Sequence, residues 1–167
     1  MIVDSYRFLP RSFRPLYEGR GPFPGDEHAV WTPFGRRLAE SRIALLTSAG
    51  IHLHSDAAFD LDAERERPEW GDPSWRVIPA SFTAPDIGCA HLHINTDDVL
   101  ADPEIALPVR ALQELVDEGV IGGAVERHVG VMGYQDRALS DWHDHTAPAI
   151  IAHLQAQQAD GLVLAPA

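Results

Sequence analysis

Short apolar runs alternate with helix-like periods over most of the chain. The run at residues 43–47 lies between Arg42 and Ser48 and is typical of a strand buried on both faces of a parallel sheet. Shorter runs predict further strands at 75–79, 90–94, 125–132 and 162–165, the last of them buried. Helical periods predict helices at 34–40, at 103–118 with Gly119 as its C-cap, and at 139–159. This alternation predicts an α/β fold with three layers and a mainly parallel sheet, as in Rossmann- or flavodoxin-like folds.

The first part of the chain follows neither period. Residues 1–33 are rich in proline, glycine and arginine with scattered aromatics, and they predict an extended N-terminal arm. Residues 34–167 predict a single α/β domain. Within it, the polar and turn-rich residues 51–73 predict a long loop over the carboxyl edge of the sheet, and loops of that length are usually functional or disordered.

Composition excludes several classes of function. The formal net charge is −12, which disfavours nucleic acid and anionic lipid as partners. No apolar run is long enough to span a bilayer, so we expect a cytoplasmic protein without a membrane partner. All 13 basic residues are arginine, which excludes a lysine Schiff base and a phosphate-binding lysine in this polypeptide. The single cysteine, Cys89, excludes an internal disulfide and is expected to be a small core residue.

Histidine is the most conspicuous candidate for chemistry, with nine in the chain. His52 and His54 follow the first strand, and His91 and His93 lie in the predicted strand at 90–94. Residues two apart in a strand project to one face of the sheet. Each pair could therefore hold a substrate by hydrogen bonds or supply a proton as a general acid.

The second histidine pair has a metal-binding alternative. Zinc is possible if His91 and His93 are joined by a carboxylate from Asp97, or from Asp56 or Asp72. Without a third ligand at fixed spacing, the same pair is a polar edge or a hydrogen-bonded substrate site.

A second cluster, residues 71–76, suggests recognition of a carboxylate. Arg76 has the planar guanidinium that binds a carboxylate through two parallel hydrogen bonds, and Asp72 lies four residues before it. Asn95 and Asp97 complete the candidate substrate-binding set. The alternative is a structural turn in which Asp72 accepts backbone N–H groups and Arg76 pairs locally.

In their order along the chain, these segments resemble the N-terminal half of the selenoprotein B subunit of the glycine, sarcosine, betaine and D-proline reductases. The resemblance runs from residue 36 to 167. It is carried by LTSAGIH at 46–52, Asp56, Phe59-Asp60, GDPSWRVIP at 71–79, HLHINTDD at 91–98, Leu107-Pro108, LQEL at 112–115, GVIG at 119–122, His128 and VMG at 131–133.

The resemblance implies reductive cleavage of a bond at the α-carbon of a small amino acid or amine-bearing acid. In this family a selenolate or cysteine thiolate attacks that carbon, and a dithiol redox protein or second reductase subunit regenerates it. The nucleophile is expected after a strand like that at 162–165, so we expect it in a missing segment, either because a selenocysteine codon was read as a stop or because a second chain carries it. No cofactor is expected in this chain itself, and a homo-oligomer is expected.

Two other classes of function stay open. A metal-dependent hydrolase or lyase would use the histidine pairs, and a non-catalytic subunit would bind a small molecule without turnover. For the reductase function, we expect one cleft at the carboxyl edge of the sheet to contain the paired histidines together with Asp72 and Arg76. The paired histidines are His52, His54, His91 and His93.

Overall fold

The computed structural model describes Pro15 and residues 32–67, 70–135 and 139–167. The chain divides into two units, Met1–Phe34 and Gly35–Ala167. The predicted arm at 1–33 lies almost entirely outside the described residues and stays a prediction, so the fold given below is that of the second unit.

The second unit alternates strands and helices. Its strands are β1 (Arg42–Thr47), β2 (Ile51–Leu53), β3 (Trp75–Pro79), β4 (Ile87–Cys89), β5 (Gly123–Ala124), β6 (Arg127–Val131) and β7 (Gly161–Ala165). Its α-helices are α2 (Leu61–Glu66), α3 (Thr96–Ala101), α4 (Val109–Asp117), α5 (Leu139–Asp141) and α6 (Ala147–Ala156). The 3-10 helices are η2 (Leu38–Glu40), η3 (Ala84–Asp86) and η4 (Pro103–Ile105), and η5 (Trp142–Thr146) is a π-helix. No helix in the described part of the chain combines the length and apolarity needed to cross a membrane.

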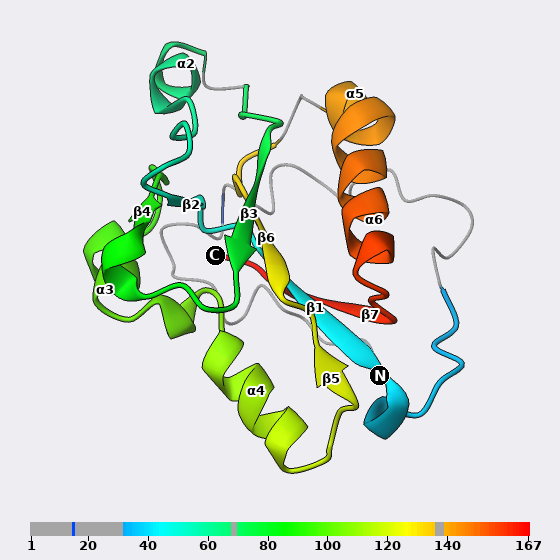
Figure 1. Cartoon of the computed structure of the whole chain (residues 1–167). Helices are drawn as coiled ribbons and strands as arrows, with labels where there is room; N and C mark the ends of the chain where they lie inside the picture. The colour runs from blue at the N-terminus through cyan, green and yellow to red at the C-terminus, as the bar shows by residue number, and fades with distance from the viewer. Residues whose placement is uncertain (1–14, 16–31, 68–69, 136–138) are drawn as a thin grey trace. The chain divides into compact units, whose positions relative to one another are not determined.

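The main sheet is built around β1. Strands β5 and β6 pair parallel with one edge of β1 and β7 pairs parallel with the other, while β3 is antiparallel to β6 (Figure 1). Strands β2 and β4 form a separate antiparallel pair. The prediction of an α/β class with a mainly parallel sheet is thereby confirmed, and the closer likeness to Rossmann or flavodoxin folds stays a prediction.

Alternate residues of β1 supply two separate hydrophobic clusters. Ile43 and Leu45 belong to the cluster that includes Leu112 of α4, whereas Ala44 belongs to the one that includes Ile150 of α6. Side chains alternate between the faces of a strand, so helices α4 and α6 cover opposite faces of the sheet (Figure 1). This explains why the run at 43–47 is apolar throughout.

His128 is part of this core. Its side chain is fully buried on β6, and its Nδ1 accepts a hydrogen bond from the backbone N–H of Leu45. Burial lowers the pKa of His128 to about 4, so the ring is neutral at pH 7.

The predicted strand at 90–94 is wrong. The strand in this region, β4, ends at Cys89, and residues 92–94 form bends before α3. The ring Nδ1 of His91 accepts from the backbone N–H of His93, and Asn95 caps α3 by accepting from Asp97 N–H. Such local side-chain bonds compete with strand pairing.

Other predicted elements need adjustment. The loop at 51–73 contains β2 and α2, whose N-cap is Asp60. The helix at 34–40 is reduced to η2, and residues 103–105 of the predicted helix at 103–118 form η4. Gly119 ends α4 in a left-handed conformation, as predicted.

The C-terminal strand is confirmed but its burial is not. Strand β7 lies parallel to β1 over residues 161–165. Within the described part of the chain it forms the edge of the sheet, and Leu162, Val163 and Leu164 are exposed. The predicted burial is therefore wrong for this strand.

Candidate functional site

An apolar cavity of about 370 Å³ lies where the three parallel strands β1, β6 and β7 end. Residues at or just past those strand ends line it, including Ser48, Gly133 and Pro166. We call it the carboxyl-edge cavity. The carboxyl edge of parallel strands is the usual position for ligands in open α/β sheets.

Trp142 lines this cavity from the start of the π-helix η5, and its Nε1 is buried without a hydrogen-bond partner among the described residues. Pro148 lies one turn further on and has no N–H to continue the helical ladder, which accounts for the wider π turn before α6. Thr146 anchors this turn by donating its hydroxyl to the Pro73 carbonyl at 2.6 Å. The predicted helix at 139–159 is therefore interrupted at the cavity.

Gln135 is another residue of the cavity lining. Its Nε2 donates to the backbone carbonyls of Asp72, at 2.6 Å, and Met132, at 3.3 Å. Both N–H groups of the amide are thus in use, which fixes the orientation of the side chain. The Oε1 atom is buried and has no hydrogen-bond partner within the described residues.

Asp72 accepts hydrogen bonds that hold the backbone at Asp60 and Ser74 in place. Its buried carboxylate accepts from the backbone N–H groups of Asp60 and Ser74 and from the Ser74 hydroxyl. These are the hydrogen bonds expected if Asp72 stabilises a structural turn and does not bind a substrate. The residue supports the site through its carbonyl, which holds Gln135.

His91 is not among the residues that line the carboxyl-edge cavity, but it lies next to one of them, Gly133, because a Cβ built on that glycine would lie 3.0 Å from His91 Nε2. His91 is 9% exposed, and burial, followed by the neighbouring His93, lowers its pKa, so the neutral ring is favoured. Since Nδ1 accepts from His93 N–H, the proton of the neutral ring is on Nε2. This Nε2–H is buried without a partner in the described structure.

His93 connects His91 to a buried carboxylate that the sequence did not single out. The two imidazole rings meet edge to face with their centroids 5.9 Å apart. The Tyr134 ring also packs against the His93 ring, with a centroid distance of 6.1 Å. His93 Nε2 is 3.6 Å from Glu64 Oε1. Burial raises the pKa of Glu64, and neither of its oxygens has a hydrogen-bond partner among the described residues.

His52 and His54 line a different cavity, of about 510 Å³, together with Cys89. The Nδ1 of His52 lies 3.1 Å from the Gly50 carbonyl, and its ring packs edge-on against Phe59. None of His91, His93, Asp72 and Arg76 lines this cavity. The structure thus gives the two histidine pairs separate environments.

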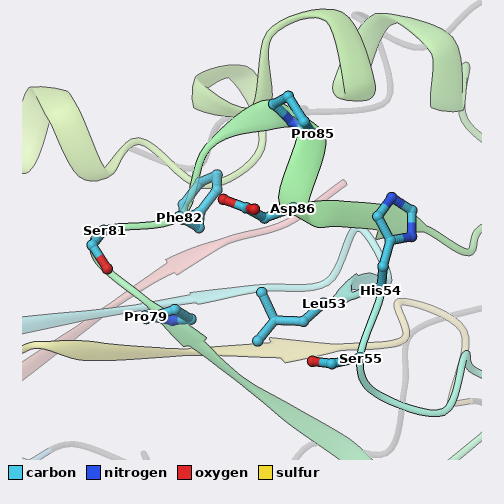
Figure 2. Close-up of a pocket in the computed structure, with 8 residues that line it drawn as sticks. All are labelled: Leu53, His54, Ser55, Pro79, Ser81, Phe82, Pro85 and Asp86. Carbon is cyan, nitrogen blue, oxygen red and sulfur yellow. The ribbon is translucent and has the colours of Figure 1, made fainter.

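His54 also lines a third cavity, of about 410 Å³, between the ends of β2 and β3 and the η3 turn (Figure 2). Asp86 is the acidic residue in its lining, and its carboxylate accepts from the backbone N–H and hydroxyl of Thr83. These bonds lower the pKa of Asp86. Figure 2 shows this carboxylate directed away from the His54 ring, so the two do not form an acid–base pair.

Arg76 is occupied by its own neighbourhood. Its guanidinium donates to the carbonyls of Ala57, Ala58 and Trp75 and to the Ser74 hydroxyl. The group also lies over the Phe59 ring at 4.4 Å. These contacts favour the structural alternative, in which Arg76 fixes the loop at 57–59, and they leave few donors for a substrate carboxylate.

The remaining substrate-binding candidates, Asn95 and Asp97, lie at the start of α3. Asn95 is the N-cap and also donates to Asp98, and Asp97 is exposed in the first turn. Across the described ranges, no group of three or more His, Cys, Asp or Glu side chains is arranged to hold a metal ion. The possible zinc site of His91, His93 and Asp97 therefore gains no support.

Cys89 has a poorly reactive environment. Burial raises the pKa of its thiol to about 11, and the Sγ donates to the Ala49 carbonyl. A thiol of such high pKa holds very little of the nucleophilic thiolate at pH 8, although each thiolate is intrinsically more reactive.

We expect iodoacetamide to alkylate Cys89 in the native chain at least about tenfold more slowly than free cysteine at pH 8. Mass spectrometry of timed samples measures the rate, and the urea-unfolded chain provides the control. Alkylation at the rate of free cysteine would show that Cys89 is an activated nucleophile.

The fold and these cavities define an α/β protein with an apolar cavity at the carboxyl edge of a mainly parallel sheet. The chain is similar to the D-proline reductase subunit gamma of Acetoanaerobium sticklandii, with 30% identity over 135 residues. The match covers 81% of this chain and 52% of that subunit, so the chain spans about half the length of its relative. This similarity supports a relationship with the proline and glycine reductases. No family model and no solved structure matches the chain.

Proposed function

We propose that this chain is the substrate-binding part of a reductase that cleaves a bond at the α-carbon of a small amino acid or amine-bearing acid. The observation that carries the proposal is the 30% identity with D-proline reductase subunit gamma. The carboxyl-edge cavity supports it, since it is mainly apolar and has the polar residues Ser48 and Gln135 in its lining, as small-molecule sites commonly do.

In the proposed reaction a selenolate or thiolate attacks the α-carbon. The carbon–nitrogen bond breaks, its electron pair stays on nitrogen, and the nitrogen takes a proton. A dithiol then reduces the carbon–selenium or carbon–sulfur adduct, and the α-carbon takes a second proton as the disulfide forms. The substrate gains two electrons and two protons, and a cyclic imino acid becomes a linear amino acid.

The nucleophile of this reaction comes from outside the described fold. Cys89 is the single cysteine of the chain. It lines the cavity of His52 and His54, and its thiol pKa is raised to about 11. We therefore assign the nucleophile to a selenocysteine or cysteine on another segment or on a second reductase subunit.

Proton supply is assigned to the group next to the carboxyl-edge cavity. His91 lies next to Gly133 of the cavity lining, His93 contacts His91, and Glu64 contacts His93. Because burial raises the pKa of Glu64, this carboxyl keeps its proton to higher pH than a solvated one and can return it to His93. We propose His91 and His93 as the histidines of the reaction, in preference to His52 and His54. A dithiol redox protein, a homo-oligomeric assembly and a cytoplasmic location belong to the same proposal.

An anaerobic assay tests this function. The chain is combined with a selenocysteine- or cysteine-bearing segment from outside the matched part of the gamma subunit, with D-proline and dithiothreitol. We expect the linear amino acid to form when both polypeptides and the dithiol are present, and the Cys89→Ala variant to retain the rate. Reduction by the 167-residue Cys89→Ala chain alone would contradict the account. Zinc-dependent turnover without dithiol would instead establish the hydrolase or lyase alternative.

A further inference from the structure

Strand β7 is an apolar strand at the edge of the sheet. Leu162, Val163 and Leu164 are exposed, and within the described residues β7 pairs with β1 alone. Edge strands of natural proteins usually carry charged side chains, proline or a bulge that prevents pairing with another chain. Residues 161–165 have none of these, and they pair in continuous register with β1. Such a strand is typical of the interior of a parallel sheet, where both faces are covered.

The exposed side chains of β7 point to both faces of the sheet. Leu162 pairs with Ala44, which belongs to the hydrophobic cluster that includes Ile150 of α6. Val163 pairs with Leu45, which belongs to the cluster on the α4 face. Paired residues of neighbouring strands point to the same face of a sheet. Because Leu162 and Val163 remain exposed, neither α6 nor α4 covers β7 itself.

Helix α6 continues this apolar surface, and it leads directly into β7 (Figure 1). Ile150 faces the core, whereas Ile151 is 53% exposed. Among residues 146–167, Asp160 is the only Asp, Glu, Lys or Arg, although these types make up 23% of the whole chain. The cores of protein interfaces are depleted of charged residues in the same way. We call Ile151 and the exposed side chains of β7 the β7–α6 surface.

A partner that covers this surface must supply a strand and apolar side chains on both faces of the sheet. A second copy of this chain, paired antiparallel through its own β7, would bring α6 to one face and leave Val163 uncovered on the other. A larger α/β segment can cover both faces. The match with D-proline reductase subunit gamma covers 52% of that subunit, so nearly half of the relative lies outside the match and is large enough to form such a segment.

We propose that the β7–α6 surface binds an α/β segment equivalent to the unmatched part of the gamma subunit, which adds a strand parallel to β7. The identity of this partner rests on the proposed function, whereas the surface follows from the exposure of β7 and α6. The carboxyl ends of parallel strands lie at one edge of a sheet. The added strand therefore ends next to the carboxyl-edge cavity, and a nucleophile on the loop that follows it lies beside that cavity.

Co-expression of the two polypeptides tests this proposal. The tagged full chain is expressed together with the unmatched part of the gamma subunit, so that each can fold against the other. We expect a one-to-one complex with a Kd of about 1 μM or tighter, measured by sedimentation velocity on dilution. In the complex, the amides of residues 162–165 should exchange hydrogen at least about tenfold more slowly than in the chain alone, because the added strand pairs with the outer N–H groups.

Two glutamate variants probe the two parts of the surface. Ile151→Glu places a carboxylate on α6, and Val163→Glu places one on β7. Each should weaken the complex at least about tenfold, because the carboxylate is buried in the interface without a partner. Ile105→Glu is the matched control, since Ile105 is 62% exposed on η4, outside the β7–α6 surface. Its complex should be as tight as that of the unchanged chain, and the circular dichroism spectra of all three variants should match.

The proposal is overturned if the two polypeptides do not purify together, or if both glutamate variants bind as tightly as the control. It is also overturned if residues 162–165 are already protected in the chain alone. A dimer in sedimentation would then show that a second copy covers β7, and a monomer that residues 1–33 cover it. Normal turnover by both glutamate variants in the reductase assay would refute this surface and leave the proposed function standing. A complex that forms through this surface without any turnover would do the reverse.

Discussion

Replacing Gly50 with alanine should destabilise the chain by about 3 kcal/mol or more. Gly50 has a φ of +69°, and a Cβ at this position would overlap the carbonyl of Ala90. The backbone of Gly50 also holds two distant segments together. Its N–H donates to the carbonyl of Val131 in β6, and its carbonyl accepts from the N–H of Ala90. Urea unfolding followed by circular dichroism measures the loss.

Gly119→Ala is the matched control for this substitution. Gly119 has a φ of +70°, yet a Cβ there would meet no heavy atom within 4 Å. The control therefore carries only the conformational strain, which is about 1 kcal/mol. The difference between the two variants measures the overlap with Ala90, and equal losses would show that Gly50 is needed for its backbone conformation alone.

Acidification should destabilise the chain through His128. The pKa of this histidine is about 4 in the folded chain and 6.5 for a solvated histidine, so the unfolded chain binds the extra proton between these values. The stability contribution is complete above pH 6.5 and is lost as pH falls towards 4. The total loss is about 3 kcal/mol, at roughly 1.4 kcal/mol per unit of pKa.

His128→Asn isolates this contribution, since asparagine keeps a polar acceptor and does not titrate. The lowered pKa of His91 acts in the same direction, and the raised pKa of Glu64 acts in the opposite one. The contributions of His91 and Glu64 are present in both the chain and the His128→Asn variant, so they cancel when the two slopes are compared. We expect urea unfolding between pH 7 and 4.5 to show a shallower slope for His128→Asn, and an unchanged slope for the exposed control His143→Asn. Identical slopes for the chain and His128→Asn would contradict the assignment of the pH effect to His128.

The sequence predicted those elements whose stability depends on local patterns. The continuous apolar run at 43–47 became β1 because both faces of this strand are covered, and Gly119 ended α4 as expected. The strand predicted at 90–94 failed because the His91 ring bonds to His93 N–H, a contact that apolar alternation does not encode. The π-helix at Trp142 depends on the position of Pro148 within a helical period that otherwise continues.

Prediction of the candidate site was similarly divided. His91 and His93 could be proposed from the sequence because paired histidines are conspicuous there. Trp142 and Gln135 were missed because they line one cavity only when the ends of distant strands meet at the carboxyl edge. Glu64 was missed because it lies in a charged segment that looks solvated, whereas the fold buries its carboxylate.

The central claim is that the carboxyl-edge cavity is the ligand site of this chain. Titration of the ¹⁵N-labelled chain with D-proline tests it most directly, with the indole resonance of Trp142 assigned by its absence in Trp142→Phe. We predict saturable shifts of that resonance and of the Gly133 amide, with no change at Gly88 and Cys89 in the cavity of His52 and His54. Shifts confined to Gly88 and Cys89, with the Trp142 indole unmoved, would contradict the account.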